Sequence, residues 1–156
     1  MAWSTSNLSG AGVSALIGGS FYGTSQTFAS DTINAALYGN TGTPNKDDTL
    51  AHNAYNGTGG QWVTANEVTG TNYTAGGTAL TSKSNTEATG TVTVTAANPS
   101  WASATISNVY GTLVYDNTVT NKYAYCWNYF GGSQSVTSGT FTVQWNASGI
   151  FTVTIS

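Results

Sequence analysis

Residues 112–130, TLVYDNTVTNKYAYCWNYF, decide the fold that the sequence predicts. After the turn-forming pair Asp116-Asn117, from Lys122 to Phe130, Tyr and Trp alternate with Ala, Cys and Asn. Alternation with a period of two is typical of a β-strand whose two faces meet different environments. A run of β-branched and aromatic residues also precedes the pair, at 112–115. We therefore expect a β-hairpin that turns near Asp116.

The same pattern extends over most of the chain. Ile33, Ala35 and Leu37 fall on one face of an expected strand that ends at Gly39. Turn-forming clusters rich in Gly, Asn and Pro separate the expected strands, among them Gly131-Gly132. The other expected strands are 61–64, 78–81, 90–95, 101–106, 140–145 and 151–155. Many short strands at this spacing indicate an all-β fold, an antiparallel β-sandwich with a jelly-roll-like arrangement.

One segment, 46–55, looks helical. An Asp can cap its start, and Leu50, Ala51 and Ala54 would share a helix face. We expect one short helical segment there. Residues 31–156 then form a single β-sandwich domain, and the Gly-rich residues 1–30 form either an N-terminal arm or its first strand.

Charged side chains make up only 6% of the 156 residues, against roughly 25% in an ordinary soluble domain. Catalysis, phosphate binding and metal capture all need ionisable groups gathered in space. With three Lys, six acids and a net charge of −3, the chain has no basic patch for nucleic acid. No apolar run approaches the ~20 residues that span a bilayer. We expect no enzyme, no cofactor, no metal, no nucleic-acid partner and no membrane.

The few ionisable side chains allow some alternatives. His52, the only histidine, and Asp48 could form part of a metal site, but two ligands are too few for zinc and a capping Asp beside a surface His is the simpler interpretation. Glu67 and Glu87, the only glutamates, could serve as the acid and base of a glycosidase, although nothing around them suggests a raised pKa. Cys126, the only cysteine, lies among aromatic residues without a neighbouring cation, which favours a buried, inert thiol. A lone cysteine cannot form an intrachain disulfide, in keeping with synthesis in a reducing cytoplasm.

The aromatic residues are the stronger candidates for binding. Alternation assigns Trp101, Trp127 and Trp145 to the core, although Trp and Tyr on a β-surface can also stack on sugars. Tyr is common at protein interfaces because it combines apolar area with a polar tip. The candidates for a subunit contact are Tyr123, Tyr125 and Tyr129.

Separate segments in order along the chain resemble a group of small virion proteins of tailed bacteriophages. In that group a strand ending in ALY is followed by a variable insert, a turn similar to EVTGTGYTAGG, two further strands and a closing hairpin. The resemblance covers roughly residues 31–156. The matching segments are 32–38 (TINAALY), 66–80 (NEVTGTNYTAGGTAL), 101–115 (WASATISNVYGTLVY), 129–134 (YFGGSQ) and 138–151 (SGTFTVQWNASGIF).

This resemblance implies a structural protein of the virion, made in the host cytoplasm and without catalytic residues. It implies a capsid decoration (cement) protein that binds the major capsid protein, or a tail accessory protein. It also implies a homo-oligomer, for which a trimer is the first choice of oligomeric state. The alternative is a carbohydrate-binding or host-adhesion module. Residues 1–20 have too few apolar groups for a core of their own, so we expect them to contact the capsid or a sister subunit. The apolar residues that would make this contact are Trp3, Leu8, Val13, Leu16 and Ile17.

Overall fold

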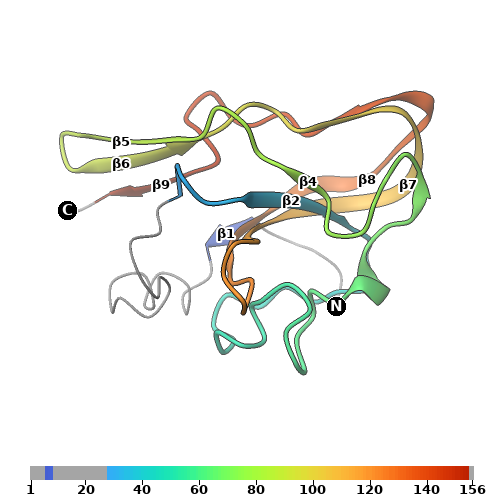
Figure 1. Cartoon of the computed structure of the whole chain (residues 1–156), viewed down its shortest axis with the longest axis horizontal. Coiled ribbons are helices and arrows are strands. Elements are labelled where there is room, and N and C mark those ends of the chain that lie inside the picture. Colours follow the sequence, from blue (N-terminus) through green and yellow to red (C-terminus); the bar gives the residue numbers. More distant parts are fainter. Residues whose placement is uncertain (1–5, 9–27, 155–156) are drawn as a thin grey trace.

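Two antiparallel sheets form the fold in a computed structural model that describes residues 6–8 and 28–154 (Figure 1). The first sheet has the order β1-β8-β7-β2-β4, and β3 pairs with the far end of β7. The second has the order β5-β6-β9. The predicted all-β class is confirmed. The strands are β1 Asn7–Leu8, β2 Ile33–Tyr38, β3 Gly70–Thr71, β4 Thr78–Ala79, β5 Ser84–Ala88, β6 Thr91–Thr95, β7 Ser100–Asp116, β8 Ala124–Thr142 and β9 Phe151–Thr154.

The long hairpin of β7 and β8 is the backbone of the first sheet. The two strands have 17 and 19 residues and turn at 117–123, which confirms the hairpin predicted near Asp116. The turn predicted at Gly131-Gly132 is wrong, because both residues lie inside β8. The pairs Val109–Gln134 and Gly111–Tyr129 are two residues apart along β7 but five residues apart along β8. The glycines therefore form a bulge, and Gly131 has the left-handed φ of 79° that such a site favours.

Strand β2 lies between β7 and β4 and is buried on both faces. Ile33 and Ala35 point toward the second sheet, where Val94 of β6 joins them in one apolar cluster. This cluster is the core between the two sheets, as a β-sandwich requires. Its members are Phe28, Ile33, Ala35, Leu80, Val94, Val114, Tyr125, Cys126 and Ile150.

The opposite face of the first sheet is covered by the loops of residues 40–66, drawn in cyan to green below β2 in Figure 1. Trp62 from these loops is 0% exposed and lies 5.5 Å, between ring centroids, from Trp127 of β8. Tyr38 of β2 meets Trp62 edge to face at 5.2 Å. The cluster consists of Ala36, Tyr38, Tyr55, Trp62, Leu113, Tyr115, Ala124 and Trp127. Aromatic side chains thus anchor a long irregular segment onto the sheet.

A third cluster fills the far end of the hairpin, beyond the bulge. Leu37 of β2 and Val68 pack there against β7 and the end of β8. Trp101 and Phe141 meet edge to face at 6.2 Å between ring centroids. The cluster consists of Leu37, Val68, Trp101, Ala104, Ile106, Val109, Phe141 and Val143.

The helix predicted over 46–55 is wrong, since this segment is a run of turns. Only the N–H of Asn53 reaches the carbonyl four residues back, on Thr49, at 2.9 Å. The side chains of Asn45 and Asp48 instead accept hydrogen bonds from nearby backbone N–H groups. Such local bonds compete with helix formation. The single helical element of the described chain is a 3-10 turn, η1, at Thr64–Asn66, at the end of the stretch predicted to be extended.

Part of the N-terminal segment extends the first sheet. Asn7 pairs with Trp127 and Leu8 with Cys126, so β1 lies beside β8. The hydroxyl of Ser6 also accepts a 2.8 Å hydrogen bond from the N–H of Tyr129. The proposed contact residues Trp3, Val13, Leu16 and Ile17 lie outside the described residues.

Candidate functional site

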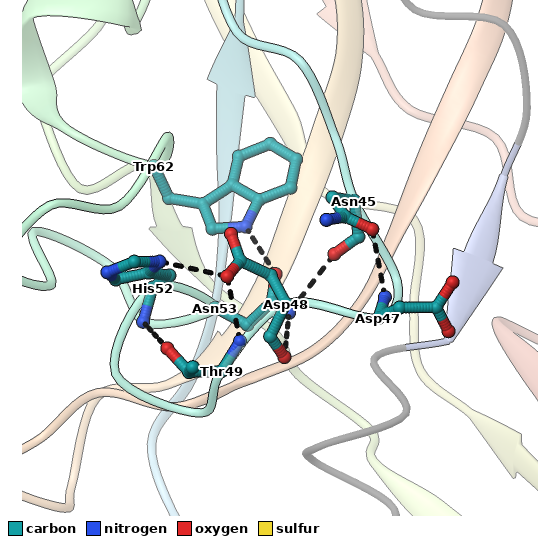
Figure 2. A network of polar contacts seen from close by, with 7 residues as sticks. All are labelled: Asn45, Asp47, Asp48, Thr49, His52, Asn53 and Trp62. Carbon is teal, nitrogen blue, oxygen red and sulfur yellow. Dashed lines mark hydrogen bonds and ion pairs between the residues drawn. The ribbon is translucent and has the colours of Figure 1, made fainter.

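The loops of residues 40–66 are organised by one buried amide, that of Asn53 (Figure 2). Asn53 is 0% exposed. Its Nδ2 donates to the carbonyls of Asn45 (3.2 Å) and Asp48 (3.3 Å), and its Oδ1 accepts from the indole N–H of Trp62 (3.3 Å). Its backbone carbonyl accepts from the N–H of Ala124 at 2.8 Å. A buried amide with every polar group partnered fixes the loops to the sheet.

His52 and Asp48 meet on the outer side of this network (Figure 2). His52 Nδ1 lies 2.8 Å from Asp48 Oδ1, and the same oxygen accepts from the N–H of Thr49 at 2.8 Å. The carboxylate therefore stabilises a turn, much as a capping Asp would. Residues 6–8 and 28–154 contain no group of three or more His, Cys, Asp or Glu side chains that could hold a metal ion.

Two surface hollows border the loops. The first, of about 360 Å³, is lined by polar residues and glycine only. The second, of about 310 Å³, lies between residues 51–58 and the hairpin turn at 120–123. Its lining combines the rings of Tyr55 and Tyr123 with amides and hydroxyls, among them Asn121, whose Nδ2 donates to the Tyr123 hydroxyl at 2.6 Å. Aromatic surface beside neutral polar groups suits a small polyhydroxylated ligand.

Glu67 accepts more hydrogen bonds from the described residues than any other acid does. It is 7% exposed. Its Oε1 accepts from the hydroxyl of Tyr73 (2.5 Å) and the N–H of Gly76 (2.7 Å), and its Oε2 accepts from the hydroxyl of Tyr55 (3.0 Å). Glu87 instead lies exposed on β5 of the other sheet, where Oε1 accepts from the N–H of Gly90. The structure therefore does not bring the two glutamates together as a catalytic pair.

Four tyrosines around Glu67 hold their protons strongly. Burial, and then the negative charge of Glu67, raise the pKa of Tyr38, Tyr55 and Tyr73 well above the usual range. Burial also raises the pKa of Tyr115, to about 12, against the lowering effect of its hydrogen bond with Asn34. These hydroxyls are donors in a structural network rather than acids poised to react.

Burial also governs the remaining candidates. Cys126 is buried, as predicted, and burial raises the pKa of its thiol well above the usual range. Of the candidate contact residues, Tyr125 is buried and meets Phe28 edge to face at 5.4 Å, while Tyr123 and Tyr129 are half-buried. Trp101 and Trp127 belong to the core as predicted, while Trp145 is half-buried against it.

Sequence reasoning missed the central roles of Glu67 and Asn53. The only signal for Glu67 was its position before Tyr73 and Gly76 in the segment 66–80. Nothing in the sequence indicated that Asn53 is buried, because an Asn in a polar stretch is typical of a surface turn.

Comparisons of the chain with known protein families, with characterised proteins and with solved structures find no match. Among the residues that the structure describes, no helix has the length and apolar character needed to cross a membrane.

Proposed function

We propose that this chain is a non-enzymatic structural protein of a tailed-bacteriophage virion, a capsid decoration protein that binds the major capsid protein and stabilises the head. The segments that resemble such proteins contribute residues that hold the fold together. Leu37 and Tyr38 of the segment 32–38 are buried on opposite faces of β2. Glu67, Tyr73 and Gly76 of the segment 66–80 form the buried carboxylate network. The resemblance thus concerns packing residues, which are the ones that define a shared fold.

The observation that carries the proposal is that the acidic side chains are buried or are bonded to other groups of the fold. Glu67, Asp31 and Asp116 are buried. Asp48 and Glu87 accept hydrogen bonds from backbone N–H groups, and Asp47 forms an ion pair with Lys46. The exposed residues of the strands are mainly Thr, Ser, Asn and Ala. Such a surface can lie against another protein while few charges lose their water.

The edges of the second sheet support the proposed homo-oligomer, for which a trimer is the first choice. Within the described chain, both outer strands of this sheet, β5 and β9, pair on one side only, with β6. Strand β9 contains neither Lys nor Pro, which commonly protect exposed edges. A neighbouring subunit that covers this edge would satisfy its unpaired backbone groups.

Binding of the purified chain to undecorated phage heads tests the proposal. We expect saturable binding at symmetry-related positions, seen by cryo-electron microscopy, and greater resistance of decorated heads to heat. Light scattering of the purified chain checks the oligomer separately. A chain that stays monomeric in solution and on heads contradicts the trimer, and one that binds neither heads nor tails contradicts the virion role.

The second hollow supports a second candidate, a carbohydrate-binding or host-adhesion module. The rings of Tyr55 and Tyr123 and the amides of Asn56 and Asn121 line it together. Trp62, by contrast, is fully buried and offers no surface to a sugar. A glycan array distinguishes this candidate: specific binding that is lost in Asn121→Ala and retained in the exposed control Asn85→Ala would favour adhesion.

A further inference from the structure

Two aspartates meet in the interior where β2 begins and β7 ends. Asp31 lies two residues before β2, and Asp116, the last residue of β7, pairs with Ile33. The N–H of Asn117 donates to the carbonyl of Thr32 (2.8 Å), and the N–H of Thr32 donates to the hydroxyl of Thr118 (2.7 Å). These bonds bring Asp31 and Asp116 close enough for their carboxyl groups to interact. Asp31 is 5% exposed and Asp116 is 0% exposed.

Each of the two carboxyl groups has one oxygen that lacks a donor. Asp116 Oδ1 accepts from the N–H groups of Thr118 (2.8 Å) and Val119 (3.4 Å), and Asp31 Oδ1 accepts from the hydroxyl of Ser30 (3.3 Å). Both Oδ2 atoms are buried without a hydrogen-bond donor. Leaving two such oxygens ionised side by side is costly, because each loses its water and each repels the other.

No positive side chain neutralises this pair. Lys46 forms an ion pair with Asp47, Lys83 donates to the carbonyl of Leu80, and Lys122 lies over the ring of Tyr55. His52 is occupied by Asp48. The chain has no further Lys, Arg or His side chain.

The other groups around Asp116 are not acids. The backbone carbonyl of Tyr123, the residue before β8, accepts the N–H of Asp116 at 2.9 Å. Burial raises the pKa of Asp116, the charge and hydrogen bond of Asp31 raise it further, and the N–H groups of Thr118 and Val119 oppose the shift. Asp31 is the one titratable group of the described residues that acts on Asp116.

We propose that Asp31 and Asp116 share one proton, and that this proton closes a pH-sensitive latch between β2 and the hairpin turn. One proton held between the two carboxyl groups would give both orphan oxygens, Oδ2 of Asp31 and Oδ2 of Asp116, a hydrogen-bond partner. When the proton leaves, two buried charges repel each other and the contacts of Thr32 with Asn117 and Thr118 loosen. The latch does not depend on the proposed role in the virion.

A divalent cation is the competing occupant. Ca²⁺ takes roughly six to eight oxygen ligands in proteins. The pair offers two orphan oxygens from described residues, whereas a proton needs no more than two. The atom count therefore favours the proton.

The direct test is an NMR titration of the side-chain carboxyl carbons in the full chain, where only six acids have to be assigned. We expect the Asp31 and Asp116 signals to report one common step, clearly above the pKa of ~4 of an ordinary aspartate. Replacement Asp116→Asn should remove that high step, and the exposed control Asp47→Asn should leave it in place. Independent titration of the two residues near pH ~4 would overturn the proposal.

Thermal unfolding as a function of pH gives a second readout. The amide in Asp116→Asn can donate to Asp31 as the shared proton does, but it cannot ionise. An ordinary Asp loses its proton near pH ~4 in the unfolded chain, whereas the folded chain retains it to higher pH, so stability falls as pH rises through this window. We expect the Tm of Asp116→Asn to exceed that of the wild type increasingly above pH ~4, and Asp31→Asn to behave alike. Equal pH profiles of wild type and both variants, or a Tm raised by Ca²⁺ in the wild type but not in Asp116→Asn, would contradict the shared proton.

Discussion

Oε2 of Glu67 accepts a 3.0 Å hydrogen bond from the hydroxyl of Tyr55, which joins the loops over one face of the sheet to the segment leading into β4. The ring of Tyr55 also stacks on Tyr115 of β7 at 4.5 Å between centroids. Through Oε1 the same carboxylate holds Tyr73 and Gly76. One buried acid therefore connects three stretches of chain that have no strand pairing with one another.

Glu67→Ala should destabilise the fold strongly. It leaves the hydroxyls of Tyr55 and Tyr73 and the N–H of Gly76 without their acceptor, at a cost of roughly 1–3 kcal/mol for each buried donor that finds no new partner. We expect a loss of about 2–4 kcal/mol in the free energy of unfolding, measured by urea denaturation. Glu87→Ala, on the exposed edge strand β5, is the control and should stay within about 0.5 kcal/mol of the wild type. Equal effects of both variants would contradict the role of Glu67.

Asn53→Ala should release the loops of residues 40–66. The indole N–H of Trp62 then loses its acceptor inside the core, and the carbonyls of Asn45 and Asp48 lose their donor. We expect a loss of about 1–3 kcal/mol in unfolding free energy and faster amide hydrogen exchange within 45–62. The exposed Asn85→Ala on β5 serves as the control. Unchanged exchange in Asn53→Ala would show that the aromatic packing alone holds the loops.

The tyrosine network predicts a loss of stability at alkaline pH. Tyr38, Tyr55, Tyr73 and Tyr115 have pKa values raised by burial, so the folded chain binds their protons more tightly than the unfolded chain. This contribution is complete below the unfolded pKa of ~10 and is lost as pH rises through the folded values, that of Tyr115 being about 12. We expect the tyrosinate absorbance of these residues to appear together with unfolding. Reversible ionisation of all nine tyrosines near pH ~10 without unfolding would contradict it.

Deletion of residues 1–20 should leave the β-domain folded and weaken attachment to the particle. The deletion removes β1, which contributes two pairs with β8 at the edge of the sheet, Asn7–Trp127 and Leu8–Cys126. We expect a retained β-type circular dichroism spectrum, a cooperative unfolding transition and reduced occupancy on phage heads. Unfolding of the truncated chain, or unchanged affinity for heads, would contradict the role of this segment as a separate contact arm.

The sequence predicted the strands whose side chains alternate between buried and other environments. Strands β2 and β6 and the hairpin turn after Asp116 were predicted, although β2 is buried on both faces and does not alternate in the structure. In the strand expected at 90–95, Val94 is buried, while Val92 and the threonines at 91, 93 and 95 are half-buried. Strand β5 gave no such pattern, because an edge strand of mostly exposed polar residues buries no face of its own.

Tertiary contacts decided what local patterns could not. The apolar residues of 46–55 have the spacing of a helix. The segment forms turns instead, because the side chains of Asn45 and Asp48 accept hydrogen bonds from backbone N–H groups. Gly131-Gly132 looks like a turn, yet the pairing of β7 with β8 continues on both sides of it. Burial of Asn53, Glu67, Asp31 and Asp116 depends on residues distant along the chain, so composition alone gives no indication of it.

The position of β2 has a consequence for the order of folding. Its partner β7 is synthesised much later, since Ile33 pairs with Asp116 and Tyr38 with Gly111. The hairpin of β7 and β8 can close locally from its turn, whereas β2 must wait for it. Until then an apolar strand that ends up buried on both faces is exposed in the nascent chain. Production of this protein will therefore be most prone to aggregation while synthesis passes from the end of β2 at Tyr38 to the end of β8 at Thr142.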